Sequence, residues 1–388
     1  MKKVTQLLGS LAALLLCLAC GDNRIEKGPI KRSGQADVVS LDDDWRFIRY
    51  GLQADGTRVE EPAGMFEPAT DDSDWETLDV PHDFAIKGPF RMDLAGNTGR
   101  LPFQGIGWYR KTFTVDEADQ GKRFYVDFDG VMANAQVWLN GEYVGTWPYG
   151  YNSFRLDLTP FIQVGKENLL AVRTDTEKWD SRWYPGAGIY RHVWLVKTGQ
   201  VHVRHWGTKI EATNLTDKTA DLHLTVEVEN HLNEDAKAVV KTSVYELDSL
   251  DCLGKRVLRF DDQTLPLKAM SAGKINLQKR MDDCKRWDIE SPNRYMACVT
   301  VQVDGQETDR YYTPFGVREI SVSREGFFLN GRRVEIKGVC NHHDLGALGA
   351  AFNRSALERQ FRIMREMGCN SIRTSHNPPA PELLDLAD

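Results

Sequence analysis

The stretch from Val334 to Asp388 constrains the fold most, because two short strand-like runs in it each lead into a cluster of polar residues. The first run, Val334–Val339, is rich in β-branched residues and leads into Asn-His-His-Asp at residues 341–344. The second run, Asn370–Thr374, leads into Ser-His-Asn at residues 375–377. We therefore expect two strands whose C-terminal ends carry polar side chains.

A helix is predicted between these two strands. Ser355 and Glu358 have the spacing of a capping box, and Gly368 suits a left-handed helix terminus, so the helix ends near Met367. Its apolar face is formed by residues at helical spacing, namely Leu357, Phe361, Met364 and Met367. Prolines then end the second strand, and Pro381 can begin another helix. This order of elements predicts a parallel βαβ unit.

The two histidine clusters indicate a site. In a βα barrel, catalytic groups gather at the C-terminal ends of the strands, and His342 and His376 both follow such ends. One histidine alone could equally be a loop residue with its hydrogen bonds satisfied. Two clusters at equivalent strand ends favour the site.

Three motifs in this stretch carry a resemblance to a known family. K-G-V-C-N-H-H-D, then N-S-I-R-T-S-H-N-P and P-E-L-L-D-L-A-D, is similar to the start of the barrel in family 2 glycoside hydrolases, which include β-galactosidases, β-glucuronidases and β-mannosidases. Asn377 stands where many members carry a tyrosine, which leaves the exact sugar open.

The resemblance implies roles for individual residues. His342 and His376 would contact sugar hydroxyls, Arg373 would orient the nucleophilic glutamate, and Asp344 and Asn377 would be their neighbours. A retaining glycosidase needs two carboxyl groups about 5–5.5 Å apart, and the family places both glutamates on later barrel strands.

We expect neither catalytic glutamate in this sequence. A complete barrel takes about 250 residues, and the sequence printed here ends at Asp388, inside the second predicted barrel helix. Glu335 lies within the predicted strand, before its C-terminal end, and Glu358 is the expected capping partner, so neither substitutes. The segment by itself is therefore expected to be inactive.

Composition sets the size and excludes one class of partner. With 388 residues, 41% hydrophobic and 27% charged, the chain can form two or three globular domains. Its net charge of -7 argues against nucleic acid, whose phosphates are bound by clustered Lys and Arg.

The N-terminus has the features of an export signal. Lys2 and Lys3 precede the apolar run Leu7–Ala19, which is too short to span a bilayer, and residues 1–20 are interpreted as a lipoprotein signal peptide with Cys20 as the lipid-bearing residue. An ordinary cleaved signal is the alternative. Residues 21–37 would form a tether. The expected location is the bacterial cell envelope, attached to a membrane through the lipid.

The remaining cysteines show no metal-binding pattern. Neither C-x-x-C nor Cys/His spacing occurs among Cys252, Cys284, Cys298, Cys340 and Cys369, so no metal or cofactor is predicted from their spacing, and a structural ion remains open. Their odd number makes buried free thiols the expected state, with Cys252 and Cys284 the first choice if one pair forms.

Residues 38–198 are predicted to form a β-sandwich. Short alternating runs and the hairpin signal Asn140–Gly141 support strands, and V-W-L-N-G-E-Y-V-G and W-Y-P-G-A-G-I-Y-R are similar to stretches of the family's jelly-roll sugar-binding domain. In the family, loops of this domain reach the barrel mouth. Candidates to close the sugar pocket are therefore Asp83, Asp180 and Arg182, with Trp183 undecided between pocket and core.

A second sandwich and the beginning of the barrel complete the predicted fold. Residues 199–318 alternate as in Leu222–Val228 and fit an immunoglobulin-like domain that acts as a spacer. Residues 319–388 begin with a hairpin around Asn330–Gly331 and lead into the barrel. The fold class is mainly β and multidomain: jelly roll, immunoglobulin-like sandwich, then the first βαβ unit of a (β/α)8 barrel.

The resemblance implies that the full protein is an exo-acting glycosidase, with β-galactosidase the first choice and β-glucuronidase or β-mannosidase next. Its partner would be a β-glycoside or oligosaccharide. A surface lipoprotein that binds carbohydrate without catalysis, or an inactive homologue, are the alternatives. The oligomeric state stays open.

Overall fold

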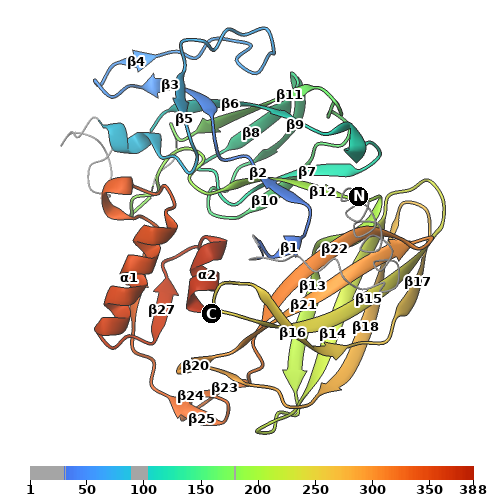
Figure 1. Cartoon of the computed structure of the whole chain (residues 1–388). Helices are drawn as coiled ribbons and strands as arrows, with labels where there is room; N and C mark the ends of the chain where they lie inside the picture. Colours follow the sequence, from blue (N-terminus) through green and yellow to red (C-terminus); the bar gives the residue numbers. More distant parts are fainter. Residues whose placement is uncertain (1–29, 31, 89–103, 179–180) are drawn as a thin grey trace, which may run out of the picture.

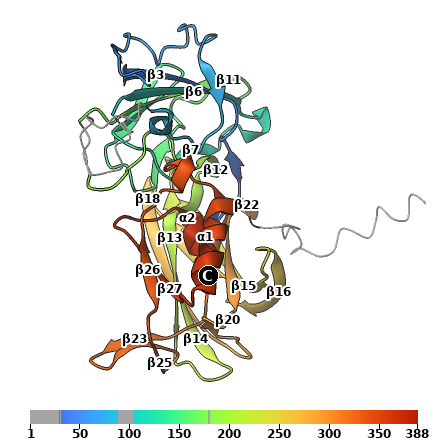
Figure 2. The same ribbon diagram turned by 90° about the vertical axis from the view of Figure 1, so that its left-hand side faces the viewer.

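The computed structural model describes residue 30 and residues 32–88, 104–178 and 181–388. Cys20, the expected signal peptide and Asp180 lie outside these residues. Two β-sandwiches are stacked end to end, and residues 319–388, called the barrel segment below, lie along one side of them (Figures 1 and 2). The mainly β architecture is confirmed.

The first sandwich contains two facing sheets. The strands of the larger sheet, in spatial order, are β4 (Arg58–Val59), β3 (Trp45–Leu52), β6 (Ile106–Thr114), β11 (Glu167–Asp175), β8 (Ala135–Leu139) and β9 (Glu142–Trp147), with β5 (Glu76–Leu78) beside β3. The smaller sheet is β10 (Phe154–Asp157), β7 (Arg123–Phe128), β12 (Val193–Thr198) and β2 (Val38–Ser40). Asn140 and Gly141 form the predicted hairpin turn between β8 and β9, both with positive φ.

One strand of this sandwich is buried on both faces. Along β7, Tyr125 and Asp127 alternate with apolar residues, yet Asp127 and, just after the strand, Asp129 are each only 1% exposed. Arg32 pairs with both carboxylates at 2.8 Å, and Arg155 pairs with Asp127 at 2.6 Å. The N-terminal segment therefore covers the face of β7 on which these carboxylates lie.

The second sandwich has the predicted alternation. One sheet is β13 (Val201–Thr213), β14 (Ala220–Asn230) and β18 (Ser271–Met281); the other contains β1 (Gly34–Gln35), β22 (Gln306–Phe315), β21 (Arg294–Val303), β15 (Ala236–Leu247), β16 (Leu253–Arg259) and β17 (Gln263–Leu267). Leu222, Leu224, Val226 and Val228 are at most 1% exposed. Their polar neighbours along β14 face outward, as an antiparallel sandwich requires.

The N-terminal segment joins both sandwiches. Gly34 and Gln35 pair with Tyr312 and Tyr311 of the second sandwich, while Arg32 binds the first. Ile30 is also buried, and its N–H donates to the Asp251 carbonyl at 2.8 Å. The described part of the segment expected as a tether over residues 21–37 is therefore packed against the domains.

The barrel segment begins with a three-stranded hairpin sheet. This sheet is β23 (Ile320–Ser323), β24 (Gly326–Leu329) and β25 (Arg332–Val334), near the small β19 (Trp287–Asp288) and β20 (Ser291–Pro292) pair. Then follow β26 (Gly338–Asn341), α1 (Arg354–Glu366), β27 (Ser371–Thr374) and α2 (Pro381–Ala387), and β26 pairs in parallel with β27. The βαβ unit is confirmed.

Two local predictions in this unit are wrong. The first strand was predicted at Val334–Val339, but β25 already ends at Val334 and β26 starts at Gly338, so Glu335 lies between strands and pairs with Lys337. The run of β-branched residues is shared by a hairpin strand and a barrel strand, which the pattern could not separate.

The helix start was also misplaced. Asn353, not Ser355, caps α1, with its side chain accepting from the Ala356 amide at 2.9 Å, while Glu358 pairs with Arg354. Leu357 and Met364 are buried as expected, but Met367 is 68% exposed at the helix end. Gly368 has the left-handed conformation that was predicted.

All five described cysteines, Cys252 and Cys284 included, are free thiols, and Cys284 alone among them is buried.

None of the helices in the described part of the chain has the length and apolar character needed to cross a lipid bilayer.

Candidate active site

Three rings from two domains meet at the ends of the barrel strands. His342 follows β26, His376 follows β27, and Trp183 comes from the loop of the first sandwich that precedes β12. The Trp183 ring centroid lies 5.6 Å from that of His342 and 5.2 Å from that of His376, and the two histidine rings are 5.5 Å apart at 88°. Both histidines are exposed, so the cluster faces solvent.

Arg373 extends this cluster along β27. Its guanidinium donates to the Ser375 hydroxyl at 3.1 Å and lies 3.4 Å from Nδ1 of His376. A guanidinium can only donate hydrogen bonds, so Nδ1 of His376 is the acceptor in this contact. The Nε2–H of His376 is then free to donate to a ligand.

Aromatic hydroxyls support the rings from the first sandwich. Trp183 Nε1 donates to the hydroxyl of Tyr151 at 3.0 Å, and the hydroxyl of Tyr149 donates to Oδ1 of Asn377 at 2.6 Å. The first bond fixes the indole plane. The second ties the loop after β27 to the first sandwich, so Asn377 is anchored beside His376.

His343 points inward, away from the exposed cluster. Its Nε2 donates to the Pro185 carbonyl at 2.9 Å, and its ring packs on Tyr151 and Tyr190 at 5.4 and 5.6 Å. Burial lowers its pKa to about 4, so the ring is neutral near pH 7.

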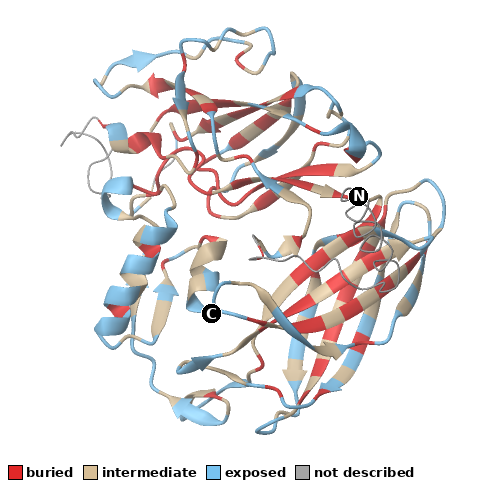
Figure 3. Ribbon diagram, viewed as in Figure 1, coloured by how far each residue is buried: buried red, intermediate tan, exposed pale blue. Residues whose placement is uncertain are grey.

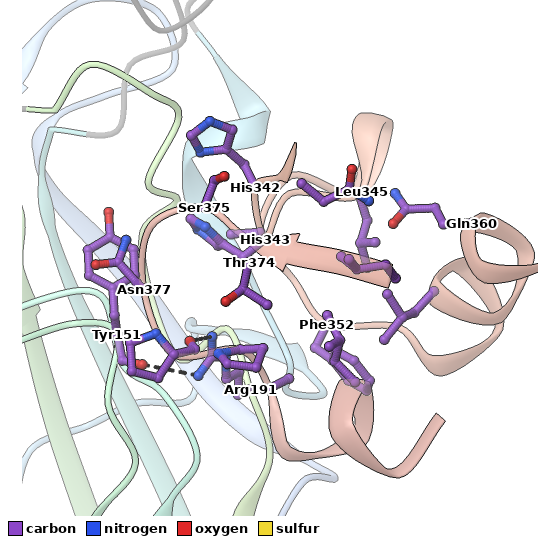
Figure 4. A pocket seen from close by; sticks show the side chains of 18 of the residues that line it. Tyr151, Arg191, His342, His343, Leu345, Phe352, Gln360, Thr374, Ser375 and Asn377 are labelled. Carbon is purple, nitrogen blue, oxygen red and sulfur yellow. Dashed lines mark hydrogen bonds between the residues drawn. The ribbon is translucent and has the colours of Figure 1, made fainter. Parts of the chain in front are cut away.

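A small pocket lies behind the strand ends (Figure 4). Its volume is about 40 Å³. Figure 4 shows Thr374 and Phe352 on one side and Tyr151 and Arg191 on the other. Arg191 donates to the carbonyls of Tyr151 and Pro378 at 3.2 and 2.9 Å, so it bridges the first sandwich and the barrel segment.

Asp83 does not line the sugar pocket as expected. It is 1% exposed, and its Oδ1 accepts from the amides of Ala85 and Ala187, both at 3.0 Å. Its Oδ2 accepts from the Ala350 amide at 2.8 Å and from the Tyr184 hydroxyl at 2.5 Å. The carboxylate therefore joins two loops of the first sandwich to the loop between β26 and α1. A buried carboxylate with its oxygens satisfied in this way has no contact left for a sugar.

The other predicted site residues differ in whether a ligand could reach them. Asp344 is half-buried, and its charge acts on Tyr184 and His343 instead of the exposed pair. Arg182 is exposed next to Trp183, where a ligand could reach it. Asp180 lies outside the described residues.

Sequence reasoning missed Tyr149 and Tyr151, and it left Trp183 undecided. The signal for the tyrosines was present as Tyr-Gly-Tyr in a loop after an expected strand, since loops carry most binding residues. Trp138 and Tyr190, in contrast, are packing residues: Trp138 stacks on Phe66 at 5.0 Å, and Tyr190 is 1% exposed.

The arrangement can bind a polar ligand that also has apolar faces. Ring N–H groups and Arg182 offer hydrogen bonds, and the indole offers a stacking surface. Glu335 and Glu358, which sequence reasoning had excluded as catalytic residues, pair with Lys337 and Arg354.

Comparison with known proteins agrees with this architecture. The family models described as the sugar binding domain, the central domain and the TIM barrel domain of glycosyl hydrolases family 2 match residues 38–199, 201–318 and 320–388. A β-galactosidase from Bacteroides ovatus is 45% identical over 89% of this chain and 39% of its own length. A putative β-glucuronidase from Formosa agariphila is 35% identical over 92% of this chain and 32% of its own length.

Solved structures give the same result. A family 2 glycosyl hydrolase from Bacteroides cellulosilyticus superposes with a TM-score of 0.81 at 34% identity, covering 90% of this chain and 44% of that one. A β-glycosidase from Bacteroides vulgatus gives 0.77 at 32% identity, covering 90% and 43%. The chain thus spans about two fifths of the length of these relatives. By its three domains and their order, it belongs to glycoside hydrolase family 2.

Proposed function

We propose that the full-length protein is a retaining, exo-acting β-galactosidase, in which this chain supplies the walls of the sugar pocket. The observation that carries the proposal is the cluster of Trp183, His342 and His376, with ring centroids 5.2–5.6 Å apart at the ends of two barrel strands. Hydrogen-bond donors beside an aromatic face suit a sugar ring, which has hydroxyls at its edge and C–H groups on its faces.

The catalytic carboxylates would come from later barrel strands. Arg373 is exposed at the mouth of β27, and its charge would orient a carboxylate brought beside it. The name of the Bacteroides ovatus relative supports galactose as the sugar, and the Formosa agariphila relative makes a glucuronide the second candidate.

A substrate panel tests the proposal. We would assay the full-length protein on aryl β-galactoside, β-glucuronide and β-mannoside, and follow the anomer released by NMR. Turnover of the galactoside with retained configuration is expected. Preference for the glucuronide would change the sugar but keep the enzyme class, whereas binding of galactose without turnover of any substrate would overturn the catalytic role.

Trp183 provides a second test within the same protein. Trp183→Ala should raise KM for the preferred glycoside by removing the stacking face, while Trp138→Ala, which alters an aromatic cluster on a β-strand of the first sandwich, should change stability instead. If both variants kept the wild-type KM, Trp183 would not contact the sugar.

We also propose that the protein is a cell-envelope lipoprotein held through Cys20. The support is the sequence alone: a basic start, the apolar run and Leu-Ala-Cys-Gly at residues 18–21. Incorporation of labelled fatty acid into the wild type, and its loss in Cys20→Ala, is the expected result. If the wild-type protein took up no label, the N-terminus would be an ordinary cleaved signal peptide and the lipoprotein proposal would be wrong.

A further inference from the structure

A group of metal-ligating side chains lies in the second sandwich, away from the strand ends of the barrel. His202 on β13 and Glu229 on β14 are direct partners across the antiparallel ladder. His231 follows two residues after Glu229, and side chains two residues apart on a strand share a face. Strand register therefore brings two imidazoles and one carboxylate together.

The ligand atoms of these residues converge. Glu229 Oε2 lies 3.3 Å from His231 Nε2 and 3.7 Å from His202 Nε2, and the ligand atoms all lie within 4.8 Å of one another. Zinc bonds nitrogen and oxygen at about 2.0–2.2 Å, so two ligands on one ion stand at most about 4.2 Å apart. The His202 and His231 rings are stacked, with centroids 5.2 Å apart at 5°, so binding an ion requires the half-buried His231 ring to rotate toward Glu229.

The hydrogen bond and the burial of His202 hold its ring in the tautomer and orientation that a metal ligand needs. It is 1% exposed, and its Nδ1 donates to the Gly199 carbonyl at 3.1 Å, which leaves Nε2 unprotonated and directed at Glu229. Such a bond from the second ring nitrogen is what orients most metal-bound histidines.

The carboxylate is held in a similar way. Arg204 lies 3.3 Å from Oε1 of Glu229, which leaves Oε2 for the histidines. The side chains of Glu229 and His231 are 27% and 24% exposed, so an ion can enter from solvent. Among the described residues, this is the one group of at least three His, Cys, Asp or Glu residues whose ligand atoms lie this close.

We propose that His202, Glu229 and His231 form a binding site for a zinc-class divalent ion. Three protein ligands leave one position for water, which faces the solvent side of the ladder. When the ion binds, His231 moves its proton from Nε2 to Nδ1, so that Nε2 becomes the ligand. The hydroxyl of Tyr125 in the first sandwich lies 3.4 Å from His202 Nε2, and an ion that takes the lone pair of this nitrogen would displace that contact.

The test uses the chain without an affinity tag, after treatment with a chelator. We expect titration calorimetry with Zn²⁺ alone to show one ion per chain and the melting temperature to rise. Co²⁺ should give visible d–d bands without a strong near-ultraviolet thiolate band, because no cysteine belongs to the site. A thiolate band would assign the ion to cysteines and overturn the proposal.

Glu229 and His231 lie on the exposed side of the site, so substitutions at these two residues are expected to leave the fold intact. His231→Ala and Glu229→Gln should each weaken Zn²⁺ binding by at least about 10–100-fold, a loss typical even of outer partners of metal ligands. His223→Ala is the matched control, since His223 lies on the same face of β14 and bonds Thr213 at 2.9 Å. Wild-type binding in both site variants, or equal loss in the control, would refute the site.

Discussion

The two sandwiches and the barrel segment differ in how they are stabilised. Each sandwich has a core of side chains that are fully buried, such as Val172 in the first and Val226 in the second, both at 0% exposure. In β26 and β27, by contrast, every residue is exposed or half-buried. Figure 3 shows the difference as red strands in both sandwiches and mostly pale strands and helices in the barrel segment.

The barrel segment therefore depends on the first sandwich for its position. Asp83 binds Ala350, the Tyr190 carbonyl accepts from Phe352 at 2.9 Å, and Arg191 binds Pro378. Buried polar contacts of this kind are directional, whereas apolar burial is not. The comparison teaches that the histidines are placed by docking between domains more than by a core of their own.

The largest expected effect comes from Asp83→Asn, which removes the acceptor of the Ala350 amide in the barrel segment and of the Tyr184 hydroxyl in the first sandwich. The amide keeps an oxygen for Ala85 and Ala187, but its NH₂ group replaces the oxygen that accepts from Ala350 and Tyr184. Two buried donors then lose their acceptor, at about 1–3 kcal/mol each, so we expect a loss of about 4 kcal/mol. Hydrogen exchange should rise over residues 345–388.

Asp116→Asn is the control for this variant, because Asp116 caps the short helix η2 (Glu117–Asp119) on the exposed side of the same sandwich. Its exchange pattern should match the wild type. If Asp83→Asn instead raised exchange around Ala85 and Ala187 and left Ala350 protected, Asp83 would serve the sandwich alone.

The next effect is catalytic and applies to the full-length protein. His376→Ala removes a preorganised donor, a loss that typically costs about 2.7–4 kcal/mol, or about 10²–10³ in rate. We expect kcat to fall by that factor with an unchanged melting temperature. His223→Ala in the second sandwich should leave kcat unaltered. A fall in kcat that merely followed the melting temperature would make His376 a structural loop residue.

The next effect is a pH dependence of the protein's stability, which arises because docking of the barrel segment buries His343. The folded-state pKa of His343 is about 4 against an ordinary 6.5, so the folded protein binds fewer protons between these values. Stability from the neutral ring is present above pH 6.5 and is lost as the pH falls toward 4, by up to about 3 kcal/mol. Protonation would place a hydrogen on Nδ1, which is buried without a partner.

The measurement compares wild type with His343→Gln, so that other titrating groups such as Asp83 and Glu382 cancel. The advantage of the wild type in urea unfolding should shrink between pH 7 and pH 4. A difference that stays constant with pH would mean that the His343 pKa is not lowered by docking.

The smallest effect is a difference in cleavage rate. β23 is exposed throughout, with Val322 at 77%, and Arg324 follows it. Trypsin should therefore cut first near Arg324, before either sandwich is cleaved. A C-terminal third that resists trypsin longer than the sandwiches would show that the barrel segment is as well stabilised as they are.

Much of the fold could be predicted from the sequence. Alternation identified the core of β14, and Asn140–Gly141 identified a hairpin, because both signals depend on neighbouring residues alone. The positions of His342 and His376 followed from strand ends, even though the first strand was misplaced. The error at β26 arose because Val334–Val339 suits either a hairpin strand or a barrel strand.

Contacts across the chain could not be predicted. Nothing near Asp83 indicates that its partner is Ala350, and the sequence pattern offered it as a pocket residue. His202 and Glu229 meet only through the register of β13 and β14, so metal-ligand spacing along the chain gave no signal. Burial of Asp127 likewise depends on Arg32, which lies far away in the sequence.

The packing of the N-terminal segment around Arg32 limits how far the two sandwiches could lie from a membrane that holds the N-terminus. If Cys20 carries a lipid, the chain between Cys20 and Ile30, which is packed against the second sandwich, extends at most about 36 Å, at about 3.3–3.6 Å per residue. The attachment point is the junction of the two sandwiches, where β1 joins β22. A lipid-anchored protein would thus be held close to the membrane by a short linker attached near its middle. Substrates within a few nanometres of the membrane surface would then be favoured over distant ones.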